Sequence, residues 1–490
     1  MPKKFELYDL TRYFHNVRKE DGTLNPILGE DELALSSCLS YLLEDNNFVI
    51  KAYSGTGKTV IMDAIFSLLP EEFYYVLEHL SETAVWYDAE KINRARFIAI
   101  PEAQKLPEAV IEVVKTWGDG RSAFRKRTDV TIGDTVETQI YAKYVFMCVA
   151  VENTKGAAYF DAELERRCMI MHTNPTVEQT ERVLKHKLMD SAVPKSKLTT
   201  MSDEDIERLK EHVLKAVIER DDEDALHIKN PCAPFLFEAI PSAFPVSRSK
   251  VQYLLKLINA VARFYPDEIL RVEKDGTQYG LVTPKHNWLG LRIYLNSFVS
   301  ECLHMPSHGT DILKLFPNTR IDRFGFADGD TIRMSNNEIK KAAKAAGLPF
   351  TKIEPILGAL LMTGFLEMDE DKGKKLYYKS PLFEEPVAKI NWSELIEETK
   401  KFMAKNWPSV AVEYGGRFCS DIEIVDPFTG DDIKLGERAK TAIDIETDAY
   451  EPFKTYKDSR IKSFEEFLLH AEGDYNEEES ERVKSHYKKS

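Results

Sequence analysis

Short apolar runs and stretches of helical periodicity alternate along the first third of the chain. Residues 31–45, DELALSSCLSYLLED, space their apolar positions as on one face of a helix, and an apolar run follows at 48–50. Further apolar runs of strand length lie at 73–77, 97–100, 144–151 and 169–172, with helical stretches between them. This alternation predicts an α/β fold over residues 31–178, in which a parallel sheet carries helices on both faces.

The next part of the chain, residues 179–305, has the pattern of helices. Residues 202–220 are highly charged, and Ser202 with Glu204 and Asp205 is typical of a helix start. The segment 247–265, SRSKVQYLLKLINAVARFY, carries one apolar stripe, formed by Val251, Leu254, Leu255, Ile258, Val261 and Ala262. We therefore expect a helical linker and a packed lid helix.

The pattern changes again in residues 306–385. Ser335 and Glu338 form a capping box for a helix that Gly347 ends, and a second helix with an apolar face follows. Residues 364–379, GFLEMDEDKGKKLYYK, read as two short strands around a charged turn. The order helix, helix, wing predicts a winged-helix domain.

The two ends of the chain have their own patterns. Residues 1–30 form an N-terminal segment, and residues 386–443 predict a small C-terminal module with a β-rich turn structure. Residues 444–490 are polar and rich in acids, which predicts an acidic, mobile C-terminal region.

Composition is that of a soluble globular protein with several domains. The 490 residues are 43% hydrophobic and 30% charged, which excludes collagen-like, disulfide-knot and wholly disordered classes. No run of eighteen apolar residues occurs, and the first ten residues lack a signal peptide's apolar core, so we expect a cytoplasmic protein without a membrane partner. The six cysteines form no CxxC pair, which favours free buried thiols.

One segment carries a strong chemical signal. Residues 46–66, NNFVIKAYSGTGKTVIMDAIF, lead an apolar strand through a glycine-rich loop into a helix, which is a Walker A loop and predicts binding of ATP and Mg²⁺. The glycines let backbone N–H groups turn toward phosphate oxygens, Lys58 adds a cation, and the Thr59 hydroxyl can ligate Mg²⁺. Ala52 stands where the motif has its first glycine, and it fits if its φ is negative. The predicted nucleotide-binding residues are Ser54, Gly55, Thr56, Gly57, Lys58, Thr59 and Val60.

Hydrolysis also needs a carboxylate that orients the attacking water. The apolar run 97–100 ends in Pro101 and Glu102, so Glu102 is the candidate base. Proline stands where a Walker B strand would have the aspartate on the metal side. The run 144–151 leads to Asn153, whose amide is placed as a sensor of the γ-phosphate and the water.

Three arginines are candidates for contacts to the γ-phosphate. Arg166 and Arg167 precede the last apolar run and could reach a nucleotide held by a neighbouring subunit, as arginine fingers do. Arg248 opens the predicted lid helix and is placed as a second sensor, in the same or an adjacent subunit.

The order of these elements resembles the AAA+ ATPases over roughly residues 30–300. More narrowly, the chain is similar to MCM-type helicases and to the helicase-like ATPases that accompany primases on phages, plasmids and integrative elements. Three segments carry this resemblance: GRSAFRKRTDVTIGDTVETQI (120–140), which reads as a β-hairpin turning at Gly133–Asp134, ELERRCMIM (163–171), and the lid sequence from 254 to 295. The resemblance implies an AAA+ P-loop core with a helical lid, and a homo-oligomeric ring, predicted to be a hexamer, with ATP between subunits.

In that family the hairpin before the sensor strand tracks nucleic acid in the channel of the ring. The whole chain has a net charge of −15, so any nucleic-acid contact must be local. Arg121, Arg125, Lys126 and Arg127 cluster beside the predicted hairpin and are the predicted contacts to single-stranded or forked DNA. Lys352, in the second helix of the predicted winged helix, is a further candidate, although that helix is largely apolar.

We therefore predict an ATP-dependent DNA helicase or translocase of a replication system, which works with a separate primase or another replication protein. Two alternatives are open at this point. Pro101 favours an origin-binding initiator or loader that acts as a switch with slow ATP turnover. An exposed aromatic in a pore loop, for which Phe124 is the candidate, would favour an AAA+ ATPase that remodels proteins.

Overall fold

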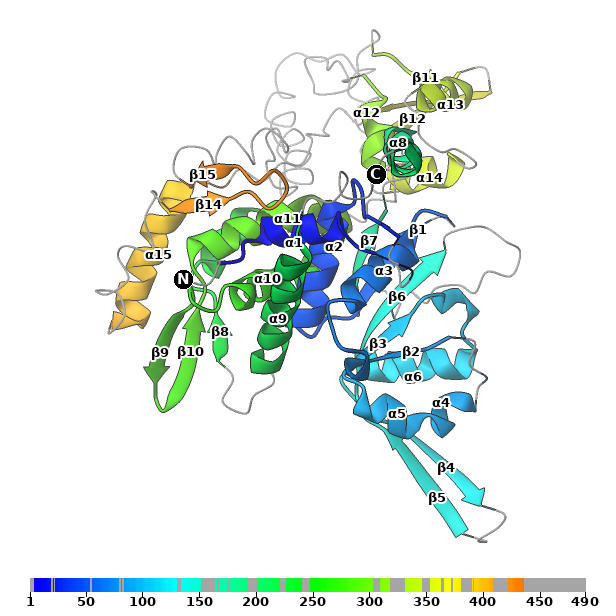
Figure 1. Ribbon diagram of the computed structural model, residues 1–490. Helices are drawn as coiled ribbons and strands as arrows, with labels where there is room; N and C mark the ends of the chain where they lie inside the picture. The colour runs from blue at the N-terminus through cyan, green and yellow to red at the C-terminus, as the bar shows by residue number, and fades with distance from the viewer. Residues whose placement is uncertain are drawn as a thin grey trace, which may run out of the picture. The chain divides into compact units, whose positions relative to one another are not determined.

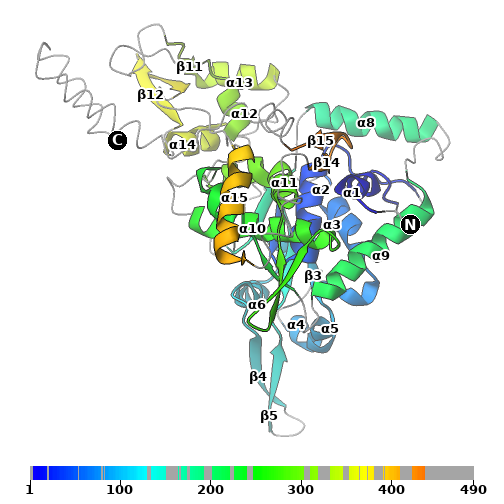
Figure 2. The ribbon, with the colours of Figure 1, turned by 90° about the vertical axis from the view of Figure 1, so that its left-hand side faces the viewer.

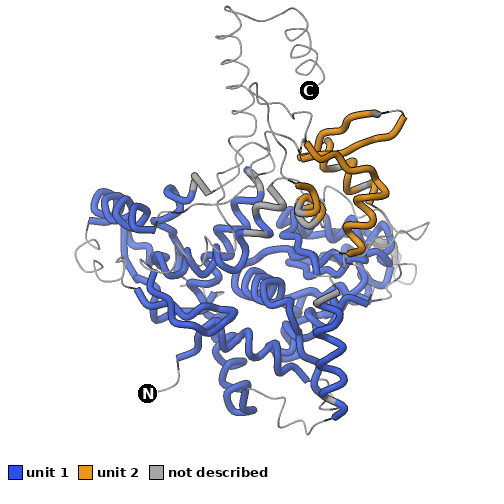
Figure 3. Tube along the Cα trace, turned by 90° about the horizontal axis from the view of Figure 1, so that it is seen from above, with its two compact units in different colours: residues 1–237, 248–298, 390–446 blue, residues 238–247, 299–389, 447–490 orange. Residues whose placement is uncertain are grey.

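The chain divides into two compact units. Unit 1 holds residues 1–237, 248–298 and 390–446, and unit 2 holds residues 238–247, 299–389 and 447–490 (Figure 3). The computed structural model describes residues 4–18, 21, 23–52, 55–78, 81, 83–129, 134–150, 164, 167–173, 177–192, 201–220, 226–239, 247–302, 309–317, 331–345, 353–362, 365–371, 373–379, 390, 392–408 and 422–435.

Unit 1 contains a five-stranded sheet in which every pairing is parallel (Figure 1). Its strands are β1 (Phe48–Ala52), β2 (Tyr74–Val76), β3 (Phe97–Ile100), β6 (Tyr144–Ala150) and β7 (Met169–His172). They lie in the order β2-β3-β6-β1-β7. The five apolar runs of the sequence are thus five strands of one parallel sheet, and the α/β prediction is confirmed.

Side chains of the strands alternate between two faces, and helices cover both. α2 (Asp31–Cys38) runs into a π-helical turn (Leu39–Leu43) on one face, where the Tyr41 ring contacts Phe97 and Phe146 at 5.2 and 5.4 Å. Phe66 of α3 (Lys58–Phe66) contacts the same tyrosine at 5.8 Å. The other face shares a core with α4 (Ala84–Tyr87), α5 (Ala89–Arg94) and α6 (Glu108–Gly118).

A β-hairpin is inserted between α6 and β6 and extends away from the sheet (Figures 1 and 2). β4 (Ala123–Asp129) and β5 (Asp134–Ile140) are antiparallel, with pairs from Ala123↔Ile140 at the root to Asp129↔Asp134 near the tip. The predicted hairpin is confirmed. Asp134, which was predicted to lie in its turn, pairs with Asp129 and is instead the first residue of β5. Gly133 lies outside the described residues.

Helices follow the sheet, as the sequence predicts. They are α8 (Val177–Ala192), α9 (Asp203–Arg220), α10 (Ser247–Phe264) and α11 (Pro284–Cys302). The predicted lid helix is α10, and Leu254, Ile258 and Val261 of its apolar stripe are buried. A small sheet of β8 (His227–Lys229), β10 (Thr277–Leu281) and β9 (Leu270–Lys274), in this order, lies among these helices.

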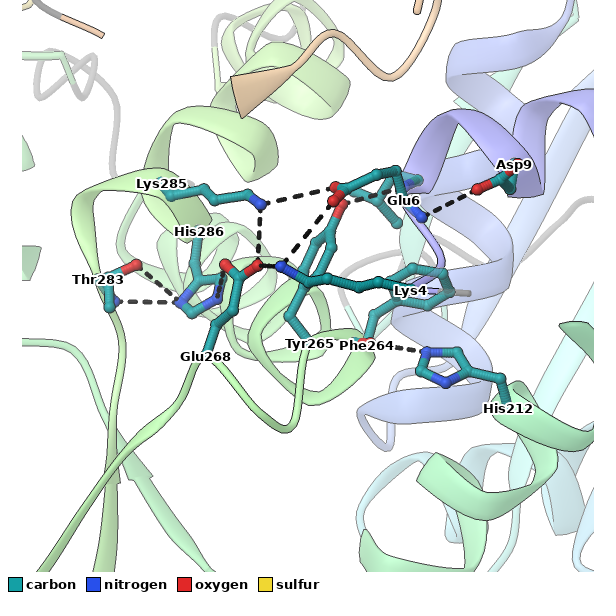
Figure 4. Close-up of polar contacts among 11 residues, drawn as sticks. Lys4, Glu6, Asp9, His212, Phe264, Tyr265, Glu268, Thr283, Lys285 and His286 are labelled. Carbon is teal, nitrogen blue, oxygen red and sulfur yellow. Dashed lines mark hydrogen bonds and ion pairs between the residues drawn. The ribbon is translucent and has the colours of Figure 1, made fainter. Parts of the chain in front are cut away.

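The N-terminal segment is tied to the helices of unit 1 by a network of charged and polar groups (Figure 4). Glu268 accepts hydrogen bonds from Lys4 and, at 3.0 Å, from Lys285. Lys285 also lies 3.5 Å from Glu6. The backbone N–H of Leu7, the first residue of α1 (Leu7–Phe14), donates to the Tyr265 hydroxyl at 3.0 Å. These contacts fix the start of the chain against the end of α10 and the start of α11.

The chain also returns to unit 1 near its C-terminal end, with α15 (Trp392–Asn406) and the hairpin β14 (Glu423–Val425) and β15 (Asp432–Lys434). Asp426, in the turn of this hairpin, pairs with Arg292 of α11 at 3.0 Å, and only 4% and 11% of the two side chains are exposed. The Arg292 guanidinium also lies over the Phe428 ring. The predicted β-rich turn structure in 386–443 is therefore an ion-paired hairpin of unit 1.

Unit 2 contains the described elements α12 (Gly309–Lys314), β11 (Met334–Ser335), α13 (Asn336–Ala345), α14 (Glu354–Met362), β12 (Leu366–Asp371) and β13 (Lys374–Lys379). Its three strands lie in the order β11-β13-β12. Ser335 donates to the Glu338 carboxylate from both its N–H and its hydroxyl at 2.7 Å, at the predicted helix start. The winged-helix assignment itself stays a prediction, and the stretch 444–490 lies outside the described residues.

Within the part of the chain that the structure describes, no helix combines the length and apolar composition needed to cross a membrane. Cys38, Cys148, Cys168 and Cys232 are free, buried thiols, as predicted for them.

Candidate nucleotide-binding site

The glycine-rich loop joins β1 to α3, and its backbone has the conformation that such a loop requires. Gly55 and Gly57 have φ values of +79° and +87°, a left-handed region that residues with a Cβ rarely adopt. Gly57 is the N-cap of α3. Ala52 ends β1 in extended backbone, and Asp275 is the one non-glycine residue with positive φ among the described residues. The alanine in the first glycine position of the motif is therefore unstrained.

The two loop glycines face open space. A Cβ built on Gly55 or Gly57 would meet no atom of the described residues within 4 Å. The first N–H groups of α3 have no partner inside the helix, and the helix dipole adds positive potential at this end. The Lys58 ammonium donates to the Ala52 carbonyl at 3.1 Å and thus folds back over the loop. These residues fit a nucleotide phosphate.

Strand order places the loop where ligands bind in open α/β sheets. β1 has β6 on one side and β7 on the other, while the chain leaves β1 for β2 at the far edge of the sheet. The carboxyl end of β1 is therefore a topological switch point, where a crevice forms between diverging connections. His172, the last residue of β7, places its Nδ1 atom 3.1 Å from the Lys51 carbonyl oxygen. No chemical motif in the sequence singles out His172, although it ends a predicted strand.

Glu102 lies two strands away from β1. β6 stands between β3 and β1, and two strand spacings amount to about 10 Å. The Glu102 carboxylate is 44% exposed and binds the Lys105 ammonium at 2.5 Å. Gln104, which sequence reasoning missed, accepts a hydrogen bond from the Ala150 N–H at 3.2 Å. It joins the turn after β3 to the end of β6.

Few of the described residues at this site could ligate a metal ion. The Thr59 residue, in the first turn of α3, is exposed and fits the role of a single protein ligand for Mg²⁺. In the described ranges, no group of three or more His, Cys, Asp or Glu residues is placed to hold a metal ion. Asp63, one turn further along α3, has its pKa raised to about 6 by partial burial and by the nearby Glu78. Burial raises the pKa of Cys148 to about 12, so this thiol stays protonated under the helix.

Arg167 lies at the opposite end of the sheet from the loop. It precedes β7, and Met169 of β7 pairs with Phe48, the first residue of β1. The five residues of β1 span about 16 Å, which is longer than an arginine side chain. The Arg167 guanidinium instead pairs with Asp119 at 2.6 Å. Arg167 therefore does not reach the loop of its own chain.

The start of α10 is held at the same end of the sheet. Lys250 is buried, and its ammonium donates to the Cys168 carbonyl at 2.9 Å, next to Arg167. Arg248, in the first turn of α10, has an exposed side chain. Sequence reasoning missed Lys250, because a lysine in a polar helix start is ordinarily solvated.

The basic residues near the hairpin do not form one uniform surface. Arg125 pairs in register with Thr138, and Lys126 with Glu137, so the two side chains point to opposite faces of the ribbon. Lys126 lies 3.8 Å from Glu137, while Arg121, before the hairpin, pairs with Asp119. Arg127 lies in β4 opposite Val136. Phe124 is exposed on the same hairpin.

Several predicted site residues cannot be placed. Ser54, Asn153, Arg166 and Lys352 lie outside the described residues. Thr56 and Val60 lie in the described part, in the loop and in the first turn of α3. The roles assigned to all these residues stay predictions.

No family model matches this chain, and no curated protein matches it. Among solved structures, a candidate ATPase from Cytophaga hutchinsonii is similar to the chain with a TM-score of 0.31 and 11% sequence identity. The match covers 53% of this chain and 79% of the other. A likeness this low carries no argument about function, which therefore rests on the site itself.

Proposed function

We propose that this protein is an ATP-dependent DNA helicase or translocase, an AAA+ motor that hydrolyses ATP between the subunits of a hexameric ring in the cytoplasm. One observation carries the proposal. The loop from Gly55 to Gly57 has the left-handed glycine conformations of a phosphate-binding loop, and it lies at the switch point of a parallel sheet. The hairpin, the arginines and the lid helix support the motor over other ATP-binding functions.

Binding of ATP uses groups that are already close together. Lys58 exchanges the Ala52 carbonyl for the β- and γ-phosphate oxygens, and the N–H groups at the start of α3 bind the same phosphates. Mg²⁺ at the Thr59 hydroxyl would neutralise part of the phosphate charge. Thr56 and Val60 line the same loop and first helical turn.

Hydrolysis requires Glu102 to orient and deprotonate a water molecule near the γ-phosphate. Its carboxylate now binds Lys105 in an exposed ion pair, which costs little to open. Asn153, at the end of the segment after β6, would hold the same water. Pro101 also favours a second candidate function, an origin-binding initiator or loader that binds ATP and turns it over slowly.

A ring is favoured by the position of the arginines. Arg167 and the start of α10 lie at the amino end of the sheet, whereas the phosphate loop lies at its carboxyl end. In a head-to-tail ring each subunit presents one end of its sheet to the next, so Arg167 and Arg248 would meet the γ-phosphate held by a neighbour. Arg166 would stand beside them.

The hairpin would contact DNA. It projects from the sheet, and the Arg125 guanidinium on β4 would bind a phosphate. Arg121, Lys126 and Arg127 would add positive charge. A winged helix in unit 2, with which the described helices and strands are compatible, would add a contact to DNA, through Lys352, or to a separate primase or another replication protein.

The test is steady-state ATP hydrolysis with and without single-stranded DNA, at low and moderate salt. We expect DNA to raise the rate, and Arg125→Ala to weaken apparent DNA affinity and to lower its salt dependence by about one phosphate contact. Lys401→Ala, an exposed lysine of α15 in unit 1, is the matched control and should change neither. Slow hydrolysis that ignores DNA would refute the motor and favour the switch, or a protein remodeller whose hairpin contact is Phe124.

A further inference from the structure

Asp119 holds two of the predicted functional arginines at once. Its Oδ1 atom pairs with Arg167 Nε at 2.6 Å, and its Oδ2 atom accepts a hydrogen bond from Arg121. Asp119 and Arg167 are about three-quarters buried, with 26% and 23% of their side chains exposed. A single carboxylate thus faces two guanidinium groups.

The backbone around Asp119 makes the root of the hairpin rigid. α6 ends in a Schellman motif, in which Arg121 N–H donates to Thr116 O at 3.1 Å and Gly120 N–H to Trp117 O at 2.7 Å. Gly120 has the φ of +69° that this cap requires. Arg121 therefore moves with the end of α6, and β4 begins two residues later.

The Arg167 side chain also packs against the end of α6. A Cβ added at Gly118 would lie 3.1 Å from Arg167 Cδ, so the bare glycine lets the arginine side chain cross the end of α6. The Arg167 carbonyl accepts a hydrogen bond from the Asn47 amide at 3.4 Å, before β1. The neighbouring Cys168 belongs to the same buried cluster as Trp117 of α6.

The hairpin root shares that cluster. Ala123 and Ile140, the first pair of the hairpin, are buried in it. On the other side, the Asn93 amide of α5 donates to the Gln139 carbonyl at 2.9 Å and accepts from the Tyr141 N–H at 2.8 Å. The hairpin root is therefore packed against the buried cluster at the end of α6 and bonded to α5.

We propose that Asp119 is a relay between DNA on the hairpin and Arg167 at the neighbouring ATP site. This inference rests on the proposed function. In the described state Asp119 holds both arginines. DNA that binds the hairpin or Arg121 alters the ion pair between Asp119 and Arg167. It thereby alters the position of the Arg167 guanidinium at the neighbour's γ-phosphate. Asp119 acts through Arg167 and is a positioning residue, not a catalytic one.

The relay predicts a difference between two arginines of the same hairpin region. Arg125 contributes only to DNA affinity, so Arg125→Ala should need several-fold more DNA but regain the wild-type stimulation at saturating DNA. Arg121 takes part in the relay, so Arg121→Ala should lower the ratio of DNA-stimulated to basal ATPase rate toward one even at saturating DNA. Arg121→Lys keeps a cation for Asp119 and should retain most of the stimulation.

A second set of variants changes Asp119 itself. Asp119→Asn should lower the same ratio, and the double variant Asp119→Asn with Arg121→Ala should be no lower than the lower single variant, because both remove one link. Glu112→Gln, which removes an exposed ion pair with Lys115 on the same helix, is the matched control and should keep the wild-type ratio. Thermal unfolding of each variant checks that the fold is intact.

The outcomes separate the two proposals. If single-stranded DNA does not stimulate the wild-type protein, the motor function is refuted and the relay falls with it. If DNA stimulates the wild type, but folded Arg121→Ala or folded Asp119→Asn keeps the full ratio at saturating DNA, the relay is wrong and the motor function stands. Loss of the ratio in Arg121→Ala, with its retention in Arg125→Ala and Arg121→Lys, would establish the relay.

Discussion

The sharpest prediction concerns two variants that should each be inactive alone and active together. Lys58→Ala removes the cation that binds the phosphates, and Arg167→Ala removes the arginine at the other end of the sheet. About 16 Å of β1 separates the two ends, so one chain cannot bring both groups to one nucleotide. If Arg167 acts, it acts on a neighbour's ATP.

The expected recovery follows from how interfaces form in a mixed ring. An interface is active when its loop comes from an Arg167→Ala subunit and its arginine comes from a Lys58→Ala subunit. In an equal, random mixture both conditions hold at about one quarter of the interfaces of a head-to-tail ring. Loss of an arginine finger costs about 10³–10⁵ in rate, so each variant alone should give essentially no signal against this recovery.

The assay is ATP hydrolysis by the two purified variants, separately and after mixing at concentrations where rings form. Each variant mixed with itself is the control, and the size of the assembled particle is checked in every sample. A mixture that assembles but stays as inactive as its parts would refute the action of Arg167 on a neighbouring site. Activity of Arg167→Ala alone close to wild type would refute any role in hydrolysis.

Further predictions concern nucleotide binding, stability and pH. Lys58→Ala should weaken ATP binding by about ten- to a hundredfold, because a charge-assisted hydrogen bond contributes about this much to affinity. Titration with a fluorescent nucleotide measures this change, and an unchanged affinity would contradict the assigned loop. Asp426→Ala removes the buried carboxylate that pairs with Arg292 and should lower the free energy of unfolding by about 3–5 kcal/mol in urea titrations. Glu423→Gln, at an exposed position of the same hairpin, should cost less than about 1 kcal/mol. Burial lowers the pKa of His212, whose Nε2 atom lies 2.8 Å from the Phe264 carbonyl oxygen. The contribution of His212 to stability is therefore complete above the unfolded-state pKa of about 6.5. It is lost as the pH falls through the folded-state pKa. His212→Gln should flatten this part of a plot of unfolding midpoint against pH, and an unchanged slope would show that another group titrates there.

Much of the fold could be predicted from the chain because it depends on local rules. Strand length and apolar composition identified the five strands of the sheet, and two of them, β3 and β7, have the predicted ends. The glycine spacing identified the phosphate loop, since only glycine adopts the φ of Gly55 and Gly57 without strain. The hairpin was also predicted, although Asp134, which was expected in its turn, pairs with Asp129 in the strands.

The chemistry around the loop was less predictable, because it depends on partners far apart in the sequence. Glu102 was chosen as the end of a strand, but its ion pair with Lys105 depends on the turn that follows β3. Gln104 and Lys250 had no distinguishing signal, since their partners are the backbone of Ala150 and Cys168. No periodicity reports such contacts.

The amino-acid sequence by itself determined which segments are strands, where the backbone must turn through glycine, and which side chains can bind phosphate, because steric limits and periodicity act over a few residues. The tertiary structure alone decided the order of the strands, and with it which segments far apart in the sequence lie together. In the folded chain Arg167, which precedes β7, lies beside Asp119 and pairs with it, and Asp119 also pairs with Arg121. The strand order is set by which strands pack together, although more than a hundred residues of sequence can separate them. No local pattern encodes that choice.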